Sequence, residues 1–353
     1  MENVISGMSS IQEGYREIQR IIRDLCEPGV SASGDNQKDY PDYEDPRIQW
    51  FSRWFKDRPT IEDSLEHVYT WRMGGGETCF LGDANTLLVN PGFFAEVAGY
   101  IRACFPTINR LTIYGRTKSA SEMPLDDLRA FKEAGLNRIH FGIESGSDKV
   151  LTFMKKGVTA EEHIEGCLKT REAGISPSVY IMPGLGGVMW SEEHAYETAR
   201  VLTKARPDYI RIRTLEIFPQ TGLMKAVEAG AFSEAQEEEV VKEIRIIIEN
   251  TDTSTTIVSD SASNLLDVNG RLPEDRKKML SVIDAYLYLK PRERLEFSLS
   301  SRLQSFIGQY GGITHDIYNA LAPYLKGGEI DFSAIPDEKI NGIIRLIRSR
   351  LMP

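Results

Sequence analysis

The chain has 353 residues and a formal net charge of −10, with hydrophobic and charged fractions of 41% and 27%. These values are typical of a globular protein with a large core, and the negative charge argues against nonspecific binding to nucleic acid. No apolar run reaches the ~18 residues of a membrane helix, and no basic region followed by an apolar one opens the chain, so we expect a cytoplasmic protein without membrane contact.

Residues 1–58 are predicted to form an N-terminal extension. Ile11 to Leu25 places apolar side chains at helical spacing, and residues 31–46 are polar, acidic and rich in turn residues. An aromatic segment that contains Trp50 and Trp54 follows. Because aromatic side chains at this density are typical of a core or an interface, this segment is one candidate surface for a protein partner.

From residue 60 the chain alternates between helical and strand patterns. Apolar runs that stop at polar or glycine residues predict strands at 78–81, 111–114, 138–146, 178–182 and 209–215. Each follows a predicted helix of about 10–15 residues, which implies right-handed crossovers and a parallel sheet, either in a barrel or in an open doubly wound sheet. No G-x-G-x-x-G follows the first strand, so the dinucleotide-binding version of the open sheet has little support.

Local signals predict where several helices begin and end. Pro124 is suited to a first helical position and Gly135 to the C-terminal end of the same helix. Thr159 and Glu162 have the spacing of a capping box. Ser191 is the expected N-cap of a helix that runs to residue 204.

The C-terminal part of the chain is predominantly helical in pattern. A further strand is predicted at 255–258, and helical patterns beyond Pro273 cover 276–289, 300–310, 315–325 and 337–351. We therefore divide the chain into an extension (1–58), a core of alternating helices and strands (59–274) and a helical region (275–353). The helical region is expected to serve as a cap or as an interface for a partner.

Polar and glycine residues gather at the carboxyl ends of the predicted strands, where parallel α/β proteins bind their ligands. The set is Gly82, Asp83, Asn85, Arg116, Glu144, Ser145, the turn 184–187, Arg213 and Glu216. Asp83 is suited to accept hydrogen bonds from an ammonium group, and Arg116 is suited to hold a carboxylate. Glu144 and Ser145 are suited to ribose hydroxyls, and the glycine turn leaves room for a flat ring or a phosphate. An amino acid joined to a nucleoside uses all of these groups, and S-adenosylmethionine is such a molecule.

Several motifs, in matching order and spacing, resemble the radical S-adenosylmethionine superfamily. They are Phe80-Leu81-Gly82-Asp83-Ala84-Asn85, Phe141-Gly142-Ile143-Glu144-Ser145-Gly146, Met154-Lys155-Lys156-Gly157 and Ile181-Met182-Pro183-Gly184-Leu185-Gly186-Gly187. Glu192-Glu193-His194-Ala195, and Asn264 with Gly270-Arg271-Leu272-Pro273, match as well. The chain is most similar to the subgroup of oxygen-independent coproporphyrinogen oxidase and elongator-type proteins, over residues 60–284.

The resemblance implies an α/β fold with a partial (β/α)6 TIM-type barrel of parallel strands, an N-terminal helical extension and a C-terminal helical region. It also implies that residues 82–84 face the methionine amino group, that Arg116 and Glu144 lie near the carboxylate and ribose, and that residues 181–187 lie near adenine. The expected cofactor-binding residues are Gly82, Asp83, Ala84, Asn85, Arg116, Glu144, Ser145, Ile181, Gly184, Gly186 and Arg213. No residue is assigned a catalytic role.

The sequence departs from the superfamily in its cysteines. Members carry a C-x-x-x-C-x-x-C loop after the first barrel strand, whose thiolates hold a [4Fe-4S] cluster. The four cysteines of this chain, Cys26, Cys79, Cys104 and Cys167, form no such loop. We interpret them as buried or idle thiols, interpret His163 and His194 as solvated or capping residues, and predict no metal ligand. Ser261 stands where the subgroup usually has histidine.

Three interpretations remain open at the level of sequence. In the first, the chain is a radical-type enzyme whose cluster loop comes from another polypeptide or from sequence not included here. In the second, it binds S-adenosylmethionine without a cluster, for group transfer or sensing. In the third, it is a degenerate scaffold. The polar strand ends favour the first two, because a scaffold does not need Asp83, Arg116 and Glu144 together. The missing thiolates weigh against the first, since the sulfonium bond is not cleaved reductively without electron delivery. The substrate, expected to be a small molecule, is not identified.

Overall fold

The computed structural model describes residues 71, 74–82 and 84–351. The predicted N-terminal helix, the linker, the Trp50/Trp54 segment and nearly all of the helix expected at 60–71 lie outside these residues, as does Asp83. The described residues divide into two compact units, which are treated separately below. The first contains residues up to 80 together with 92–111, and the second contains 81–91 and 112–351.

The first unit contains most of β1 (Thr78–Leu81) and of α4 (Pro91–Cys104). The Trp71 indole donates a hydrogen bond to the Thr78 carbonyl oxygen at 2.7 Å, and its ring meets the Phe105 ring edge-on at 5.7 Å between centroids. Phe94 of α4 is buried. These contacts join the strand and the helix of this unit.

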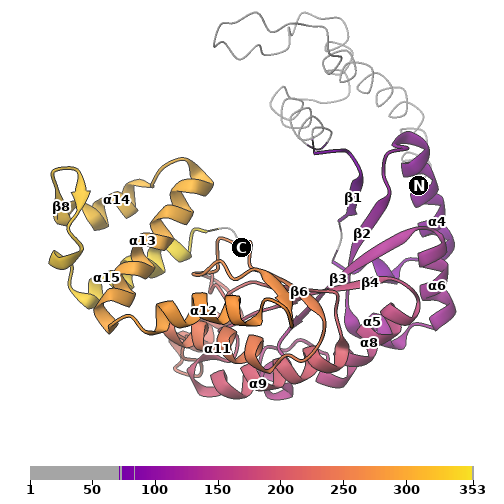
Figure 1. Ribbon diagram of the computed structural model, residues 1–353, viewed down its shortest axis with the longest axis horizontal. Coiled ribbons are helices and arrows are strands. Elements are labelled where there is room, and N and C mark those ends of the chain that lie inside the picture. The colour runs from indigo at the N-terminus through magenta and orange to yellow at the C-terminus, as the bar shows by residue number, and fades with distance from the viewer. Residues whose placement is uncertain (1–70, 72–73, 83, 352–353) are drawn as a thin grey trace, which may run out of the picture. The chain divides into compact units, whose positions relative to one another are not determined.

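The second unit is built on strands that lie side by side in chain order (Figure 1). They are β2 (Arg110–Gly115, of which Thr112 onward belongs to this unit), β3 (Leu136–Glu144), β4 (Ser176–Ile181), β5 (Tyr209–Ile212), β6 (Thr255–Val258) and β7 (Gly270–Leu272). Strands β3 to β6 are parallel and β7 is antiparallel to β6. The strand order never reverses, which is the winding of a barrel and excludes the doubly wound alternative. The predicted α/β class with a partial, open barrel is therefore confirmed.

The connections between the strands are helical. They are η1 (Thr86–Leu88), α5 (Thr117–Glu122), α6 (Leu125–Glu133), α7 (Asp148–Phe153), α8 (Ala160–Glu172), α9 (Gly187–Ala205), α10 (Gly222–Glu228) and α11 (Glu237–Asn250). Of these, α5, α6, α8, α9 and α11 lie along one side of the sheet (Figure 1). In β3 the alternate residues Ile139, Phe141 and Ile143 are fully buried. Because side chains alternate along a strand, His140 and Glu144 lie on the opposite, inner face.

The local helix signals are confirmed with two adjustments. Pro124 is the N-cap of α6 and not its first helical residue. The capping box at α8 forms, with the Thr159 amide donating to Glu162 and the Glu162 amide donating to Thr159. Helix α9 begins at Gly187, before the expected N-cap Ser191. Trp190 has non-helical dihedral angles, so the regular helix resumes at Ser191, whose hydroxyl donates to Glu243 instead of capping.

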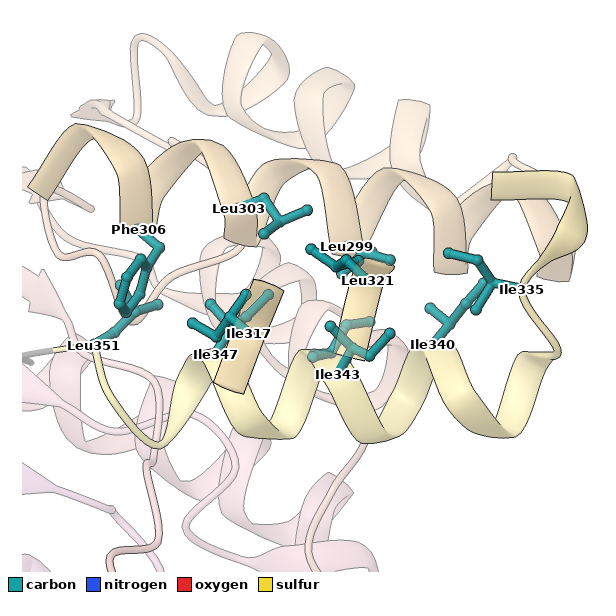
Figure 2. Packing of buried hydrophobic residues seen from close by; sticks show 11 residues of the cluster. Leu299, Leu303, Phe306, Ile317, Leu321, Ile335, Ile340, Ile343, Ile347 and Leu351 are labelled. Atoms are coloured by element: carbon teal, nitrogen blue, oxygen red, sulfur yellow. The ribbon is translucent and has the colours of Figure 1, made fainter. Parts of the chain in front are cut away.

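The C-terminal helices after α12 (Arg276–Leu287) form a separate hydrophobic core within this unit. They are α13 (Pro291–Tyr310), α14 (His315–Leu321) and α15 (Asp337–Arg348), with η2 (Ala322–Tyr324), β8 (Leu325–Lys326), β9 (Glu329–Ile330) and η3 (Phe332–Ala334) before α15. Figure 2 shows α13 and α15 side by side with apolar side chains between them, among them Leu299, Leu303, Ile343 and Ile347. Helix α13 begins nine residues before the predicted start at 300 because Pro291 occupies its first turn.

Candidate functional site

A pocket of about 710 Å³ lies at the carboxyl ends of the parallel strands, within the size range of small-molecule sites. Four of the residues predicted from the sequence line it, namely Ala84, Arg116, Glu144 and Arg213. They come from three strand ends and from the segment after β1, and all belong to the second unit. The tertiary structure therefore brings these four together.

Glu144 reaches the pocket through an irregularity at the end of β3. Its φ angle of 63° is left-handed, and the pairing of β3 with β4 shifts between Gly142 and Glu144. Such bulges redirect side chains and are found beside functional sites. A Cβ atom at Gly142 would lie 2.9 Å from the Glu144 carboxylate oxygen, so the glycine makes room for that carboxylate. The Glu144 carboxylate forms an ion pair with Lys156, which also lines the pocket.

Arg116 is held at both its backbone and its guanidinium. The Arg116 amide donates to the Asn85 side-chain oxygen at 3.0 Å, and Asn85 in turn donates to the Ser119 hydroxyl at 2.9 Å. The guanidinium donates to the Lys156 carbonyl oxygen at 2.7 Å. Asn85, predicted as a ligand contact, thus positions Arg116 and does not itself line the pocket.

The other predicted residues are placed elsewhere. Ser145 is fully buried and shares a 2.8 Å hydrogen bond with the His194 ring, and Ile181 is buried in the core. The Gly184 amide donates to the Glu243 carboxylate at 2.6 Å, and a Cβ atom at Gly186 would lie 2.9 Å from the Trp190 carbonyl oxygen. The glycine turn therefore packs against protein atoms and is not part of the pocket lining. Gly82 is also outside the lining.

The interpretation of His163 and His194 as solvated or capping residues is wrong. Both are fully buried, and His163 shares a 2.7 Å hydrogen bond with the Thr117 hydroxyl. Burial lowers the pKa of each imidazole from 6.5 to about 4. The sequence signal for His194 was the small residues Ala195 and Thr198 on the same helix, which mark a closely packed face.

The sequence interpretation missed the aromatic and lysine side chains of the pocket. Tyr114, His140 and Tyr180 lie on the inner faces of β2, β3 and β4, and Lys118, Lys155 and Lys156 come from the adjoining segments. Tyr114 precedes Arg116 by two positions, so strand alternation places the two side chains on the same face. The two-residue spacing between Tyr114 and Arg116 was therefore the sequence signal that Tyr114 lines the pocket.

The described residues do not fit a [4Fe-4S] cluster. Cys79 lies in β1, Cys104 is the last residue of α4, and Cys167 is buried in α8, where burial raises its thiol pKa to about 12. Cluster ligation requires several thiolates from one place, whereas these three cysteines belong to three different elements. Within the described ranges, no three or more His, Cys, Asp or Glu side chains are grouped as a metal site needs.

No helix in the described part of the chain has the length and apolar character to span a bilayer.

Comparison with curated proteins gives distant relatives. A tRNA uridine(34) acetyltransferase of Methanocaldococcus jannaschii is 23% identical over 117 residues, covering 33% of this chain and 22% of that protein. The acetyltransferase of the same name from Methanocaldococcus infernus is 22% identical over 119 residues, with the same shares. The chain thus spans about a fifth of the length of the curated relatives that it matches.

Similar solved structures include both protein types named from the sequence motifs. The archaeal Methanocaldococcus infernus Elp3 with an N-terminal deletion is 16% identical, with 60% of this chain and 53% of that chain covered and a TM-score of 0.44. Coproporphyrinogen III oxidase from Escherichia coli is 14% identical, with 78% of each chain covered and a TM-score of 0.35. The family model described as the radical SAM superfamily matches residues 46–199, the segment that contains the strand-end motifs through residue 187. This match identifies residues 46–199 as similar to the radical S-adenosylmethionine superfamily and confirms the resemblance seen in the motifs.

Proposed function

We propose that the pocket at the carboxyl ends of the strands binds S-adenosylmethionine. The observation that carries this proposal is that Ala84, Arg116, Glu144 and Arg213 line one cavity. Arg116 and Glu144 were selected from the sequence for groups that an amino acid joined to a nucleoside presents. Ala84 was selected from the family resemblance and Arg213 from its position at a strand end. The similarity of residues 46–199 to the radical S-adenosylmethionine superfamily supports the same ligand.

Arg116 and Glu144 are assigned complementary parts of the ligand. The Arg116 guanidinium, fixed on the Lys156 carbonyl oxygen, retains donors for the ligand carboxylate. The Glu144 carboxylate already accepts the Lys156 ammonium, and the ammonium of S-adenosylmethionine is the same kind of donor. Ribose hydroxyls are the alternative donors to this carboxylate.

We assign no radical step to the described residues, because they do not fit a cluster. Formation of the 5′-deoxyadenosyl radical is proposed only for an assembly that supplies the [4Fe-4S] cluster from outside these residues. Without it, the bound sulfonium would serve polar group transfer or sensing, which is the second candidate. The scattered cysteines favour this second candidate. A partner protein that binds the C-terminal helices or the Trp50/Trp54 segment is proposed from the sequence alone.

Calorimetric titration of the full chain with S-adenosylmethionine tests the proposal. Glu144→Ala and Arg116→Ala should each weaken binding about tenfold, because each removes a charge-assisted hydrogen bond. Arg129→Ala is the matched control, since Arg129 lies on α6 in an exposed ion pair with Asp126. Unchanged affinity in both site variants would contradict the assignment. Iron analysis after anaerobic reconstitution separates the two candidates, because about four irons per chain indicate a bound cluster.

A further inference from the structure

The floor of the pocket is an aromatic surface made by three adjacent strands. Tyr114, His140 and Tyr180 come from β2, β3 and β4. The ring centroids are 6.1 Å apart for Tyr114 and His140, 5.5 Å for His140 and Tyr180, and 6.5 Å for Tyr114 and Tyr180. The His140 and Tyr180 rings are tilted by 35° to each other and the Tyr114 ring stands at 75° to His140, so a flat ring that stacks on one of them can meet the edge of another.

The pocket is strongly cationic in a chain whose net charge is −10. Its lining includes the cationic side chains of Arg116, Lys118, Lys155, Lys156 and Arg213, and a single carboxylate, that of Glu144. Glu162 pairs with Lys118 at 3.0 Å, and Asp260 pairs with Arg213 at 2.8 Å, which offsets part of this charge. S-adenosylmethionine carries two positive groups and one negative group, so its binding adds to the excess of positive charge in the pocket.

Positive charge concentrates beside Tyr180. The Arg213 guanidinium carbon lies 5.4 Å from the Tyr180 ring centroid, and Arg211 pairs with Tyr180 in the strand register. One carboxylate, that of Asp260, serves both arginines, at 2.8 and 3.3 Å. Arg213 lines the pocket, whereas Arg211 does not. Arg213 is therefore the cation beside Tyr180 that can receive an acidic group of a ligand.

We propose that Tyr114, His140, Tyr180 and Arg213, here called the Tyr180 subsite, bind the co-substrate of S-adenosylmethionine. That co-substrate is a flat ring that carries a carboxylate or a phosphate. The ring lies on the aromatic floor, and the acidic group lies at Arg213. The inference rests on the proposed function, because it names the second molecule of the same pocket.

Three indole derivatives that differ in side-chain charge test the subsite on the unmodified chain. Indole-3-acetate is an anion, indole-3-ethanol is neutral and tryptamine is a cation at pH 7. In calorimetric titrations, indole-3-acetate should bind at least about tenfold more tightly than tryptamine, with the alcohol between them. Equal affinities, or tighter binding of tryptamine, would overturn the proposal. Phenyl phosphate and phenylacetate then distinguish the two acidic groups, and failure of both to bind would overturn it as well.

Variants locate the bound probe. Arg213→Gln and Tyr180→Leu should each weaken indole-3-acetate binding about tenfold, whereas Tyr180→Phe, which keeps the ring, should weaken it less than Tyr180→Leu does. Arg129→Gln is the control for loss of a surface arginine. Wild-type affinity in both Arg213→Gln and Tyr180→Leu would exclude this subsite. The charge series needs no variant, so the proposal stays testable even if Arg213→Gln does not fold.

Different outcomes contradict the proposed function and this inference. Glu144→Ala should weaken binding of S-adenosylmethionine but leave the preference for indole-3-acetate over tryptamine intact. Absence of S-adenosylmethionine binding together with that preference would contradict only the cofactor assignment. Binding of S-adenosylmethionine without the preference would overturn only the co-substrate.

Discussion

At the scale of single residues, two glycines shape the site because they lack a side chain. Gly142 leaves the space into which the Glu144 carboxylate extends, whereas Gly146 lets the end of β3 approach the backbone of α9. An added Cβ atom would lie 2.9 Å from a flexible carboxylate at Gly142 but 2.2 Å from the Glu197 carbonyl oxygen at Gly146. The same substitution is therefore expected to have opposite consequences at these two positions.

Gly142→Ala should impair ligand binding without unfolding the protein. The methyl group displaces the Glu144 carboxylate, so affinity for S-adenosylmethionine should fall about as far as in Glu144→Ala, roughly tenfold. The melting temperature should stay within a few degrees of wild type, since a flexible side chain moves at little cost. Gly222→Ala, where a Cβ atom meets nothing within 4 Å, is the control for both measurements. Wild-type affinity in Gly142→Ala would show that the Glu144 position is not required.

Gly146→Ala should destabilise the fold instead. The methyl group collides with the backbone of α9, which cannot move without disturbing the packing of this helix, so a loss of about 1–3 kcal/mol or more is expected. Urea unfolding monitored by circular dichroism measures it against the same Gly222→Ala control. A stability equal to that of the control would contradict the close approach of β3 and α9.

At the scale of elements, a buried polar network connects the ends of β3 and β4 with α9 and α11. The His194 ring lies 2.8 Å from the Ser145 hydroxyl oxygen and 3.2 Å from the Met182 carbonyl oxygen. The Glu243 carboxylate of α11 accepts hydrogen bonds from the Gly184 amide and the Ser191 hydroxyl, both at 2.6 Å. Burial lowers the pKa of His194 to about 4 and raises the pKa of Glu243 to about 7. Titration of this network is therefore linked to stability.

We expect stability to be greatest near pH 6.5. His163 and His194 have folded pKa values of about 4, below the ordinary 6.5, so their contribution is lost as the pH falls from 6.5 toward 4. Glu243 has a folded pKa of about 7, above the ordinary 4.5, so its contribution is lost as the pH rises from 4.5 through 7. Between pH 4.5 and 6.5, raising the pH restores the contributions of two histidines and removes that of one carboxyl group, so stability rises. Above pH 6.5 only the Glu243 contribution changes, so stability falls.

Glu243→Gln isolates the carboxyl contribution. The amide oxygen still accepts from Gly184 and the amide nitrogen can donate to Ser191, but the group no longer titrates. Melting temperatures from pH 6.5 to 8 should fall for the wild type and stay level for this variant. Parallel curves for the two proteins would contradict the raised pKa of Glu243.

At the scale of the whole chain, buried ion pairs join the C-terminal helices to the barrel within the second unit. Arg302 of α13 has no exposed side-chain surface and donates to both Glu237 carboxylate oxygens, at 2.9 Å each. It also donates to the Ser263 carbonyl oxygen after β6, at 2.9 Å. Arg348 of α15 pairs with Glu216 after β5 at 2.9 Å. Glu216, selected from the sequence as a strand-end residue, thus serves the fold and not the pocket.

Arg302→Met should destabilise the chain by up to about 3–5 kcal/mol, because it removes two hydrogen bonds to the buried Glu237 carboxylate and leaves it only the 3.9 Å ion pair with Arg348. Adding Glu237→Gln should restore part of that loss, since it removes the buried charge. Urea unfolding of the single and double variants measures both effects, with Arg129→Ala as the surface control. A double variant no more stable than Arg302→Met would contradict this account.

The sequence by itself determined the alternation of helices and strands, the capping box at Thr159 and the polar strand ends. These features depend on periodicity and on hydrogen bonds between near neighbours, which a single segment contains. The tertiary structure decided the winding of the sheet and which strand-end residues share a pocket. It placed Arg116 and Glu144 in the cavity but turned Ser145 and Gly184 toward the buried groups of α9 and α11. The partners of those two residues are 49 and 59 positions away in the chain, a distance over which local patterns carry no information.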